Sequence, residues 1–280
     1  MGKVAVIGLC GNSLFFSVDR FHEPGQTLSA EACMEEIGGK GFNQAAAAAR
    51  MGAETVFLAA VGDDADGEKC RLAALSCGVT PMLAVKKGER TAIACILTDA
   101  AGENRVTVYR GAALTAKDVA AFEPAIAASD ILLLQHEVPP EVNEAAALLA
   151  KKHGVRVILN PAPAREISPA LAETLYLVTP NGQEAPCVEH LSGCNRIVTL
   201  GADGCNLNGE HLAPMAVTPV DTTGAGDTFT GTLAAFLAQG LSLSEACRRA
   251  ICAAGLSVTK PGVLNAIPTK TELERKLAEC

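Results

Sequence analysis

The chain has 280 residues, of which 49% are hydrophobic and 19% charged, and its formal net charge is -8. This composition is typical of a globular chain that fills one large α/β domain, with or without a small appendage. The acidic excess argues against nucleic acid as a partner, and no apolar run reaches the ~20 residues that a membrane helix needs.

The N-terminal run Val4–Leu9 is short and apolar, and no small-residue cleavage site follows it. We therefore interpret it as a first buried strand and not as a signal peptide. The 11 cysteines are odd in number and contain no C-x-x-C spacing, which argues against a disulfide framework and a zinc site. These features predict a reduced, cytoplasmic protein without a membrane partner.

Short apolar runs recur along the chain and alternate with alanine- and leucine-rich stretches of helical spacing. Strands that are apolar throughout and separated by helices indicate a mainly parallel sheet covered on both faces. Ligands of such sheets collect at the carboxyl ends of the strands. The predicted strands are Val4–Leu9, Thr55–Val61, Ile131–Gln135, Val155–Asn160, Leu175–Thr179 and Arg196–Leu200, and Gly67–Cys77 and Glu141–His153 are predicted helices.

Two segments, at about 14–37 and 91–110, break this rhythm, because they alternate apolar and polar residues and contain turn signals. The second, TAIACILTDAAGENRVTVYR, has the pattern of a β-hairpin. We expect both segments to form a small antiparallel sheet that stands off the main domain as a lid.

Gly38–Glu54, GGKGFNQAAAAARMGAE, places a glycine cluster before a helix. It is not a P-loop, because Lys40 is followed by glycine and the G-x-x-x-x-G-K spacing is absent. A tight turn before a closely packed helix explains the alanines. It does not explain Lys40 and Asn43, polar residues at a glycine-lined helix start.

Asp221–Phe229, DTTGAGDTF, also precedes a helical pattern. Backbone N–H groups at a helix N-terminus attract anions, and Gly224 and Gly226 allow a ligand to approach closely. Asp227 either complements the helix dipole, or acts as a general base toward an alcohol that attacks a phosphoryl group in the turn. These nine residues alone leave both readings open.

GGKGFNQAAAAARMGA and DTTGAGDTFTG resemble the two signature segments of the ribokinase (PfkB) family of carbohydrate kinases. Further similar segments follow one another along nearly the whole chain: PGQTL, VGDDADG, NPAPARE, TPNGQE, TLGADG and SVTKPGVLNAIP. The resemblance implies a ribokinase-like three-layer α/β sandwich with a β lid, here spanning residues 1–280. It also implies transfer of the ATP γ-phosphoryl group to a hydroxyl of a sugar.

The resemblance also assigns roles to residues. Asp227 matches the catalytic base, and Gly224, Ala225 and Gly226 match the anion hole. The sugar-contacting positions are Gly39, Lys40, Asn43 and Glu137. Asn181 and Glu184 match a pair that organises Mg²⁺ largely through water, and the segment containing Thr199, Gly201 and Gly204 lies beside the nucleotide.

A potassium site near the anion hole is common in the family. Its ligands in this chain would be the Asp221 side chain and main-chain carbonyls around Thr223, Ser257, Lys260 and Gly262. A serine expected near the end of this loop is Ala266 here, so one oxygen ligand is missing.

The chain departs from the family pattern in two places. The family's N-x-D after the first strand aligns with Gly11 and Ser13, although a shift of one residue would enlist Asn12. Loss of the carboxylate would weaken ribose binding by ~1.5–3 kcal/mol, roughly ten- to a hundredfold. After TPNGQE, a helical segment is shortened and Gly182 replaces a common acidic residue.

We therefore expect a magnesium- and ATP-dependent kinase that phosphorylates a hydroxymethyl group of a small sugar other than ribose. A nucleoside kinase of the same family and a non-catalytic sugar or nucleotide sensor are the alternatives. Exposed lid edges suggest a homodimer through the lid.

Overall fold

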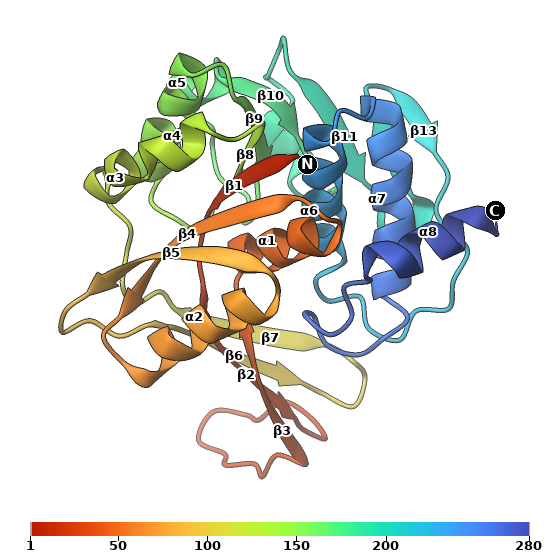
Figure 1. The fold of residues 1–280 in the computed structure, drawn as a ribbon. Helices are drawn as coiled ribbons and strands as arrows, with labels where there is room; N and C mark the ends of the chain where they lie inside the picture. Colours follow the sequence, from red (N-terminus) through yellow and green to blue (C-terminus); the bar gives the residue numbers. More distant parts are fainter. Residues whose placement is uncertain (1, 280) are drawn as a thin grey trace.

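The computed structural model describes residues 2–279, and within them the strands form two separate sheets (Figure 1). The larger is nine-stranded, in the order β13-β12-β11-β10-β9-β8-β1-β4-β5. Its strands are β1 (Lys3–Ile7), β4 (Glu54–Gly62), β5 (Val79–Lys86), β8 (Ile131–Gln135), β9 (Arg156–Asn160), β10 (Leu175–Val178), β11 (Asn195–Thr199), β12 (Cys205–Leu207) and β13 (Glu210–Leu212). Neighbours from β11 to β5 run parallel, and β12 and β13 add an antiparallel edge.

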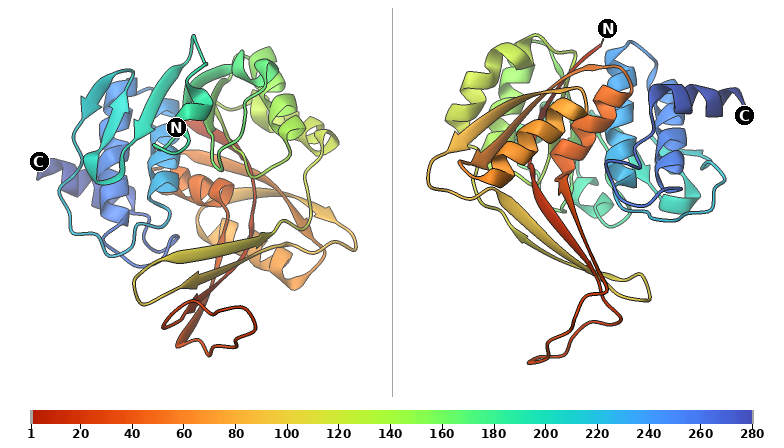
Figure 2. Two further views of the ribbon diagram at one scale, coloured as in Figure 1. Left: turned by 180° about the vertical axis from the view of Figure 1, so that it is seen from behind. Right: turned by 60° about the horizontal axis from the view of Figure 1, so that its bottom comes forward.

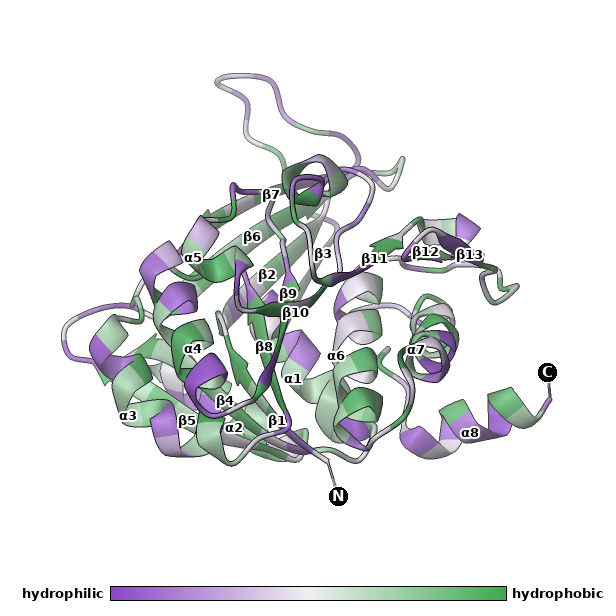
Figure 3. Ribbon diagram, turned by 90° about the horizontal axis from the view of Figure 1, so that it is seen from above, coloured by the Kyte–Doolittle hydropathy of each residue, from purple (hydrophilic) through white to green (hydrophobic). Residues whose placement is uncertain are grey.

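Helices cover both faces of this sheet, as the apolar strands predict. One core cluster packs the sheet against α1 (Lys40–Arg50), α2 (Ala65–Ser76), α6 (Ala225–Ala238), α7 (Leu243–Ser257) and α8 (Lys270–Ala278). The other packs it against α3 (Ala116–Ala127), α4 (Pro140–Lys152) and α5 (Pro169–Ala172). Figure 3 shows hydrophobic central strands, with hydrophilic residues on outward turns of the helices. The expected three-layer α/β sandwich is confirmed.

The lid is a four-stranded sheet in the order β3-β2-β6-β7, and it projects from one side of the main body (Figure 2). Its strands are β2 (Gly11–Ser17), β3 (Ala32–Gly38), β6 (Ala92–Thr98) and β7 (Asn104–Tyr109). The predicted hairpin is β6–β7. The prediction of a fully antiparallel lid is wrong, because β2 and β6 pair in parallel.

The first lid strand also begins earlier than expected. Gly11 to Ser13 belong to β2 and pair with both β3 and β6, so these positions are not in a loop. A Cβ atom on Gly11 would lie 2.4 Å from the carbonyl oxygen of Ala92. Glycine at position 11 is therefore required for β2 and β6 to approach each other this closely.

The chain between Glu184 and β11 is short, as expected. It consists of a single 3₁₀ turn, Ala185–Val188, followed by a bend. No disulfide joins two cysteines within residues 2–279. No helix between residues 2 and 279 is long and apolar enough to cross a membrane.

Candidate active site

Two cavities meet at the N-terminus of α6. The lid pocket, of about 710 Å³, lies between the lid and the main body. The helix cleft, of about 380 Å³, lies beside α6 and α7. A smaller cavity of about 180 Å³, hereafter the junction cavity, lies between them. It is lined by Lys40, Asn160, Ala162, Thr179, Asn181, Glu184, Thr199, Thr222, Gly224, Ala225, Gly226, Asp227 and Thr230.

The turn at the start of α6 has no side-chain cap. Gly224 is the N-cap, with φ 75° and no side-chain hydrogen bond. By contrast, the hydroxyl of Ser242 caps α7. A residue other than glycine at 224 would be strained at this φ, and its Cβ would lie 2.5 Å from Cγ1 of Val263. The backbone N–H of Ala225 donates to the carbonyl oxygen of Thr222 (3.3 Å) and so closes the turn. The glycine-lined backbone of this turn, hereafter the amide nest (residues 224–226), lies at the positive end of the α6 dipole and forms a site for an anion.

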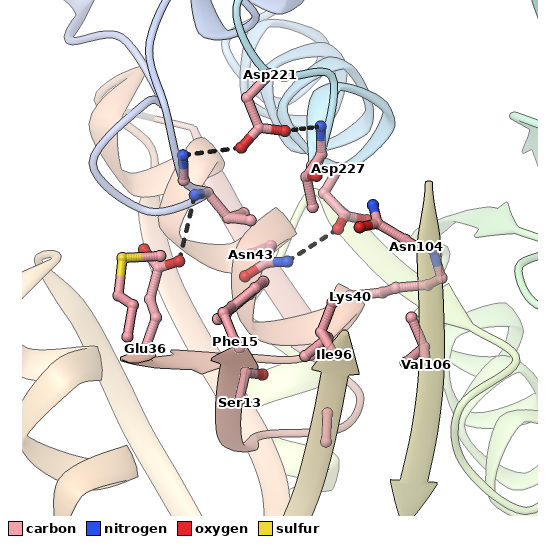
Figure 4. Close-up of a pocket in the computed structure, with 18 of the residues that line it drawn as sticks. Ser13, Phe15, Glu36, Lys40, Asn43, Ile96, Asn104, Val106, Asp221 and Asp227 are labelled. Atoms are coloured by element: carbon pink, nitrogen blue, oxygen red, sulfur yellow. Dashed lines mark hydrogen bonds between the residues drawn. The ribbon is translucent and has the colours of Figure 1, made fainter. Parts of the chain in front are cut away.

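Asp227 is buried, with 7% of its surface exposed, and it lines the lid pocket. Its carboxylate oxygens accept hydrogen bonds from Asn43 Nδ2 (3.0 Å) and from Gln44 Nε2 (2.9 Å). Figure 4 shows the bond from Asn43 across the base of the pocket. These partners are side chains of α1, so the carboxylate is held by another helix and does not cap its own. This geometry favours the second reading of Asp227.

Sequence reasoning missed the amides that hold Asp227 from behind. Gln44 Nε2 also donates to Asn160 Oδ1 (3.1 Å), and Gln135 Nε2 donates to Gln44 Oε1 (2.7 Å). Gln135 and Asn160 are the last residues of the neighbouring strands β8 and β9. Their position at the carboxyl ends of parallel strands was the signal that could have identified them.

Lys40 and Glu137 lie on the main-body side of the lid pocket. The Glu137 carboxylate accepts a hydrogen bond from the backbone N–H of Lys40 (2.7 Å) and so caps α1. The negative charges of Asp227, Glu137 and Glu184 raise the pKa of the Lys40 ammonium, against the effect of its burial. Lys40 therefore stays charged among three carboxylates, where it can balance added negative charge.

Burial raises the pKa of Glu137 from 4.5 to about 7, and the charge of Asp227 adds to this effect while Lys40 opposes it. Between pH 4.5 and 7 the folded state thus binds more protons than the unfolded state. We expect this carboxyl group to lower the free energy of unfolding by roughly 3 kcal/mol as pH rises through this window, with no further loss above it.

Denaturant unfolding of the wild type and of Glu137→Gln at pH 5 and pH 8 measures this effect. The variant should lose less stability than the wild type between the two pH values. Glu141→Gln, in the first turn of α4, is the matched control and should keep the wild-type dependence. An unchanged pH dependence in Glu137→Gln would contradict the assignment.

Asn181 and Glu184 form a compact pair at the side of the junction cavity. Glu184 is 8% exposed, and its two oxygens accept from the backbone N–H of Asn181 (2.9 Å) and from Asn181 Nδ2 (3.1 Å). No cluster of three or more His, Cys, Asp or Glu residues that could hold a metal ion occurs within residues 2–279. A single carboxylate in the same cavity as the amide nest fits a magnesium ion that keeps most of its water.

The expected nucleotide residues lie together. Thr199, Gly201 and Gly204 line the helix cleft, and Asn181 forms a parallel bridge with Thr199. The cleft shares Ala225 and Gly226 with the junction cavity.

Of the residues expected to bind potassium, Asp221, Thr223 and Gly262 lie together. Asp221 accepts hydrogen bonds from the backbone N–H groups of Thr223 (2.9 Å) and Gly262 (3.0 Å). Ser257 is buried at the end of α7, and its hydroxyl donates to the Ala254 carbonyl oxygen. The Lys260 side chain turns away to an ion pair with Glu272.

On the lid, alternate residues of β2 face opposite ways. Ser13 and Phe15 line the lid pocket, and Figure 4 shows them with Ile96 opposite the main-body residues. The side-chain nitrogen of Asn12 instead donates to Glu35 (2.6 Å) and to Asp66 of α2 (3.0 Å). Asn12 also contributes to the pocket lining, but its amide nitrogen is engaged with carboxylates at the lid–α2 contact. Both register neighbours of Ser13, Glu36 and Ala94, line the pocket.

Comparison with known proteins agrees with this geometry. The model of the pfkB family of carbohydrate kinases matches residues 1–270. The chain belongs to this family.

Relatives of this pfkB family kinase include the ribokinase of Haemophilus influenzae, 36% identical over 294 residues that cover 96% of each chain. The structure of Arabidopsis thaliana ribokinase complexed with ribose and ATP matches with a TM-score of 0.88 and 29% identity over 99% of both chains. Ribokinase from Thermotoga maritima matches with a TM-score of 0.90 and 30% identity over 99% of this chain and 100% of that one. The expected family and fold are confirmed, and the protein is a phosphotransferase that acts on a sugar or sugar-like alcohol.

Proposed function

We propose that this pfkB family kinase transfers the γ-phosphoryl group of ATP to a hydroxymethyl group of a small sugar or sugar-like acceptor, with Asp227 as general base. The observation that carries the proposal is the position of Asp227. Its carboxylate lies where the lid pocket meets the junction cavity, directly after the amide nest. An alcohol in the lid pocket and a phosphate at the nest would both reach it.

In this mechanism the acceptor binds in the lid pocket against Gly39, Lys40, Asn43 and Glu137. The Asn43 Oδ1 atom is buried and has no hydrogen-bond partner within the described residues, so it can accept from an acceptor hydroxyl. The acceptor oxygen then bonds to the γ-phosphorus as the bond to the ADP oxygen breaks. The hydroxyl proton passes to Asp227, and the nest amides stabilise the charge that develops on the phosphoryl oxygens.

Glu184 and Asn181 are the residues that would hold magnesium, mostly through water. Magnesium, when bound, neutralises charge on the phosphate oxygens. The same proposal places ATP in the helix cleft beside Thr199, Gly201 and Gly204. It places potassium at the Asp221 side chain and at the carbonyls around Thr223, Ser257, Lys260 and Gly262.

We propose that ribose is a poor acceptor. Position 13 carries a hydroxyl group, and Glu36 is its partner in register on β3. The lid face also presents Phe15, Ile96 and Val106 to a pocket of about 710 Å³. This apolar surface and volume favour an acceptor with a deoxygenated position or an apolar substituent, and they make a nucleoside the second candidate.

The test is an ATP-consumption screen over pentoses, deoxy sugars, sugar phosphates and nucleosides, with and without potassium, for the wild type and Asp227→Asn. At least one acceptor should be phosphorylated at a rate that depends on Asp227, and ribose should be turned over at least tenfold less efficiently. Equal turnover of ribose and the best alternative contradicts the acceptor proposal alone. No Asp227-dependent phosphorylation would instead favour a sensor.

We further propose that residues 1–280 act as one kinase domain in the cytoplasm, and that two copies pair through their lids. Strand β7 is an open edge of the lid sheet, and its Tyr109, which is not among the residues that line the lid pocket, is 57% exposed. This favours pairing along the β7 edge. Size-exclusion chromatography with light scattering should give twice the mass of one chain.

A further inference from the structure

Glu36 joins the lid to the C-terminal part of the main body. It lies on β3 on the lid face that lines the lid pocket. Its carboxylate oxygens accept hydrogen bonds from the backbone N–H groups of Val263 (3.2 Å) and Leu264 (2.8 Å). Figure 4 shows the carboxylate directed at the backbone of this loop, away from Ser13.

The loop that Glu36 holds, residues 261–264, is itself attached to the amide nest. The backbone N–H of Gly262 donates to Asp221, and Asp221 also accepts from the backbone N–H of Thr223, one residue before the nest. The Val263 side chain packs on Gly224 so closely that a Cβ there would lie 2.5 Å from it. Displacement of this loop would therefore change the position of the nest.

Other side chains of the lid make their polar contacts with α2. Asn12 bonds to Asp66 of α2, and Glu35 forms an ion pair with Lys69 of the same helix. Within residues 2–279, Glu36 is the lid side chain that hydrogen-bonds to the segment from 219 to 264. None of the residues that line the helix cleft or the junction cavity belongs to the four lid strands. A ligand in those two cavities thus has no direct contact with the lid.

We propose that Glu36 is a positioning residue that couples the lid to the amide nest, so that nucleotide at the nest stabilises the lid and acceptor under the lid stabilises the nest. This inference rests on the proposed function. A carboxylate suits the task because it accepts two N–H bonds at once and charge strengthens both. Such coupling is reciprocal, because each ligand favours the same arrangement of the shared loop.

The alternative is that Glu36 only stabilises the loop locally. Both readings predict a less ordered loop when Glu36 is removed. Only coupling predicts that a ligand bound at the nest slows hydrogen exchange in the lid, which the ligand does not contact. Only coupling also predicts that this effect requires Glu36.

Hydrogen–deuterium exchange with and without β,γ-imido-ATP and Mg²⁺ separates the two readings. In the wild type, the analogue should slow exchange at residues 222–227 and also, at least threefold, along β3 (Ala32–Gly38). In Glu36→Ala it should slow exchange at residues 222–227 only. Glu35→Ala is the matched control, because this neighbour faces α2, and it should respond as the wild type does.

Glu36→Gln keeps the side-chain shape and one strong acceptor, and it should give an intermediate lid response if Glu36→Ala fails to fold. A steady-state assay adds a second readout. The Glu36→Ala substitution should lower kcat at least tenfold, and the KM for ATP should lose the decrease with rising acceptor concentration that the wild type shows.

A lid response that is absent in the wild type, or that is equal in the wild type and Glu36→Ala, overturns the coupling. The proposed function is judged separately, by whether phosphorylation depends on Asp227.

Discussion

Replacing Asp227 with asparagine should lower kcat by roughly 10²–10⁴-fold, because the acceptor hydroxyl loses the group that takes its proton. The chain should still fold, since the two side chains have the same shape. Asparagine has one acceptor oxygen, however, while both Asn43 and Gln44 donate to position 227. One donor would lose its partner, and the free energy of unfolding should fall by about 1–3 kcal/mol.

The measurements are steady-state rates with the best acceptor, and binding of an ATP analogue by calorimetry. The dissociation constant of the analogue should change little, because the nest amides remain. Glu245→Gln is the matched control, since Glu245 is also an acidic residue in the first turn of a helix, in the capping box of α7. It should leave kcat unchanged. An Asp227→Asn enzyme within tenfold of the wild type would exclude Asp227 as the base.

Replacing Gly226 with valine should lower kcat/KM for ATP by roughly 10²–10³-fold without loss of stability. Gly226 lies inside the first turn of α6, its φ is not positive, and nothing lies within 4 Å of its Cβ position. The backbone therefore tolerates a side chain. That side chain would enter the open space beside the nest, where we propose that the phosphates bind.

Gly224→Ala provides the contrast two residues earlier. There the φ of 75° and the contact with Val263 should make the substitution destabilising. Thermal unfolding and initial rates on both variants separate the two effects. If Gly226→Val lowers the melting temperature as much as Gly224→Ala does, the space at 226 is structural and does not receive phosphate.

The sequence predicted much of the fold, because buried parallel strands are apolar along their whole length and need no tertiary information to be recognised. The strand Val79–Lys86 was missed because it lies at the sheet edge. Several of its residues are exposed, so its sequence is not apolar throughout, as that of a buried strand is. The parallel pairing of β2 with β6 was also missed. Strand direction within a sheet depends on how separate segments meet, and local patterns do not encode it.

The signature residues of the candidate site were predictable because they sit at glycine-rich helix starts, which have a recognisable chemistry. Gln44, Gln135 and Glu36 were not, because their partners lie 91 to 228 positions away in the chain. Ser13 and Asn12 could not be distinguished before the start of β2 was known. Both residues line the pocket, and the strand register decides that the amide nitrogen of Asn12 is the one that bonds to Glu35 and Asp66.

The tight packing of Gly11 on Ala92 bears on attempts to convert this kinase into an efficient ribose enzyme. An asparagine at 11 would force two strands apart, and an aspartate at 13 would stand across from the negatively charged Glu36. Each single substitution thus destabilises the lid, and this cost offsets any improvement in its contacts with the sugar. Converting the acceptor preference would require simultaneous changes on three neighbouring strands, so a library that varies one position at a time should miss it.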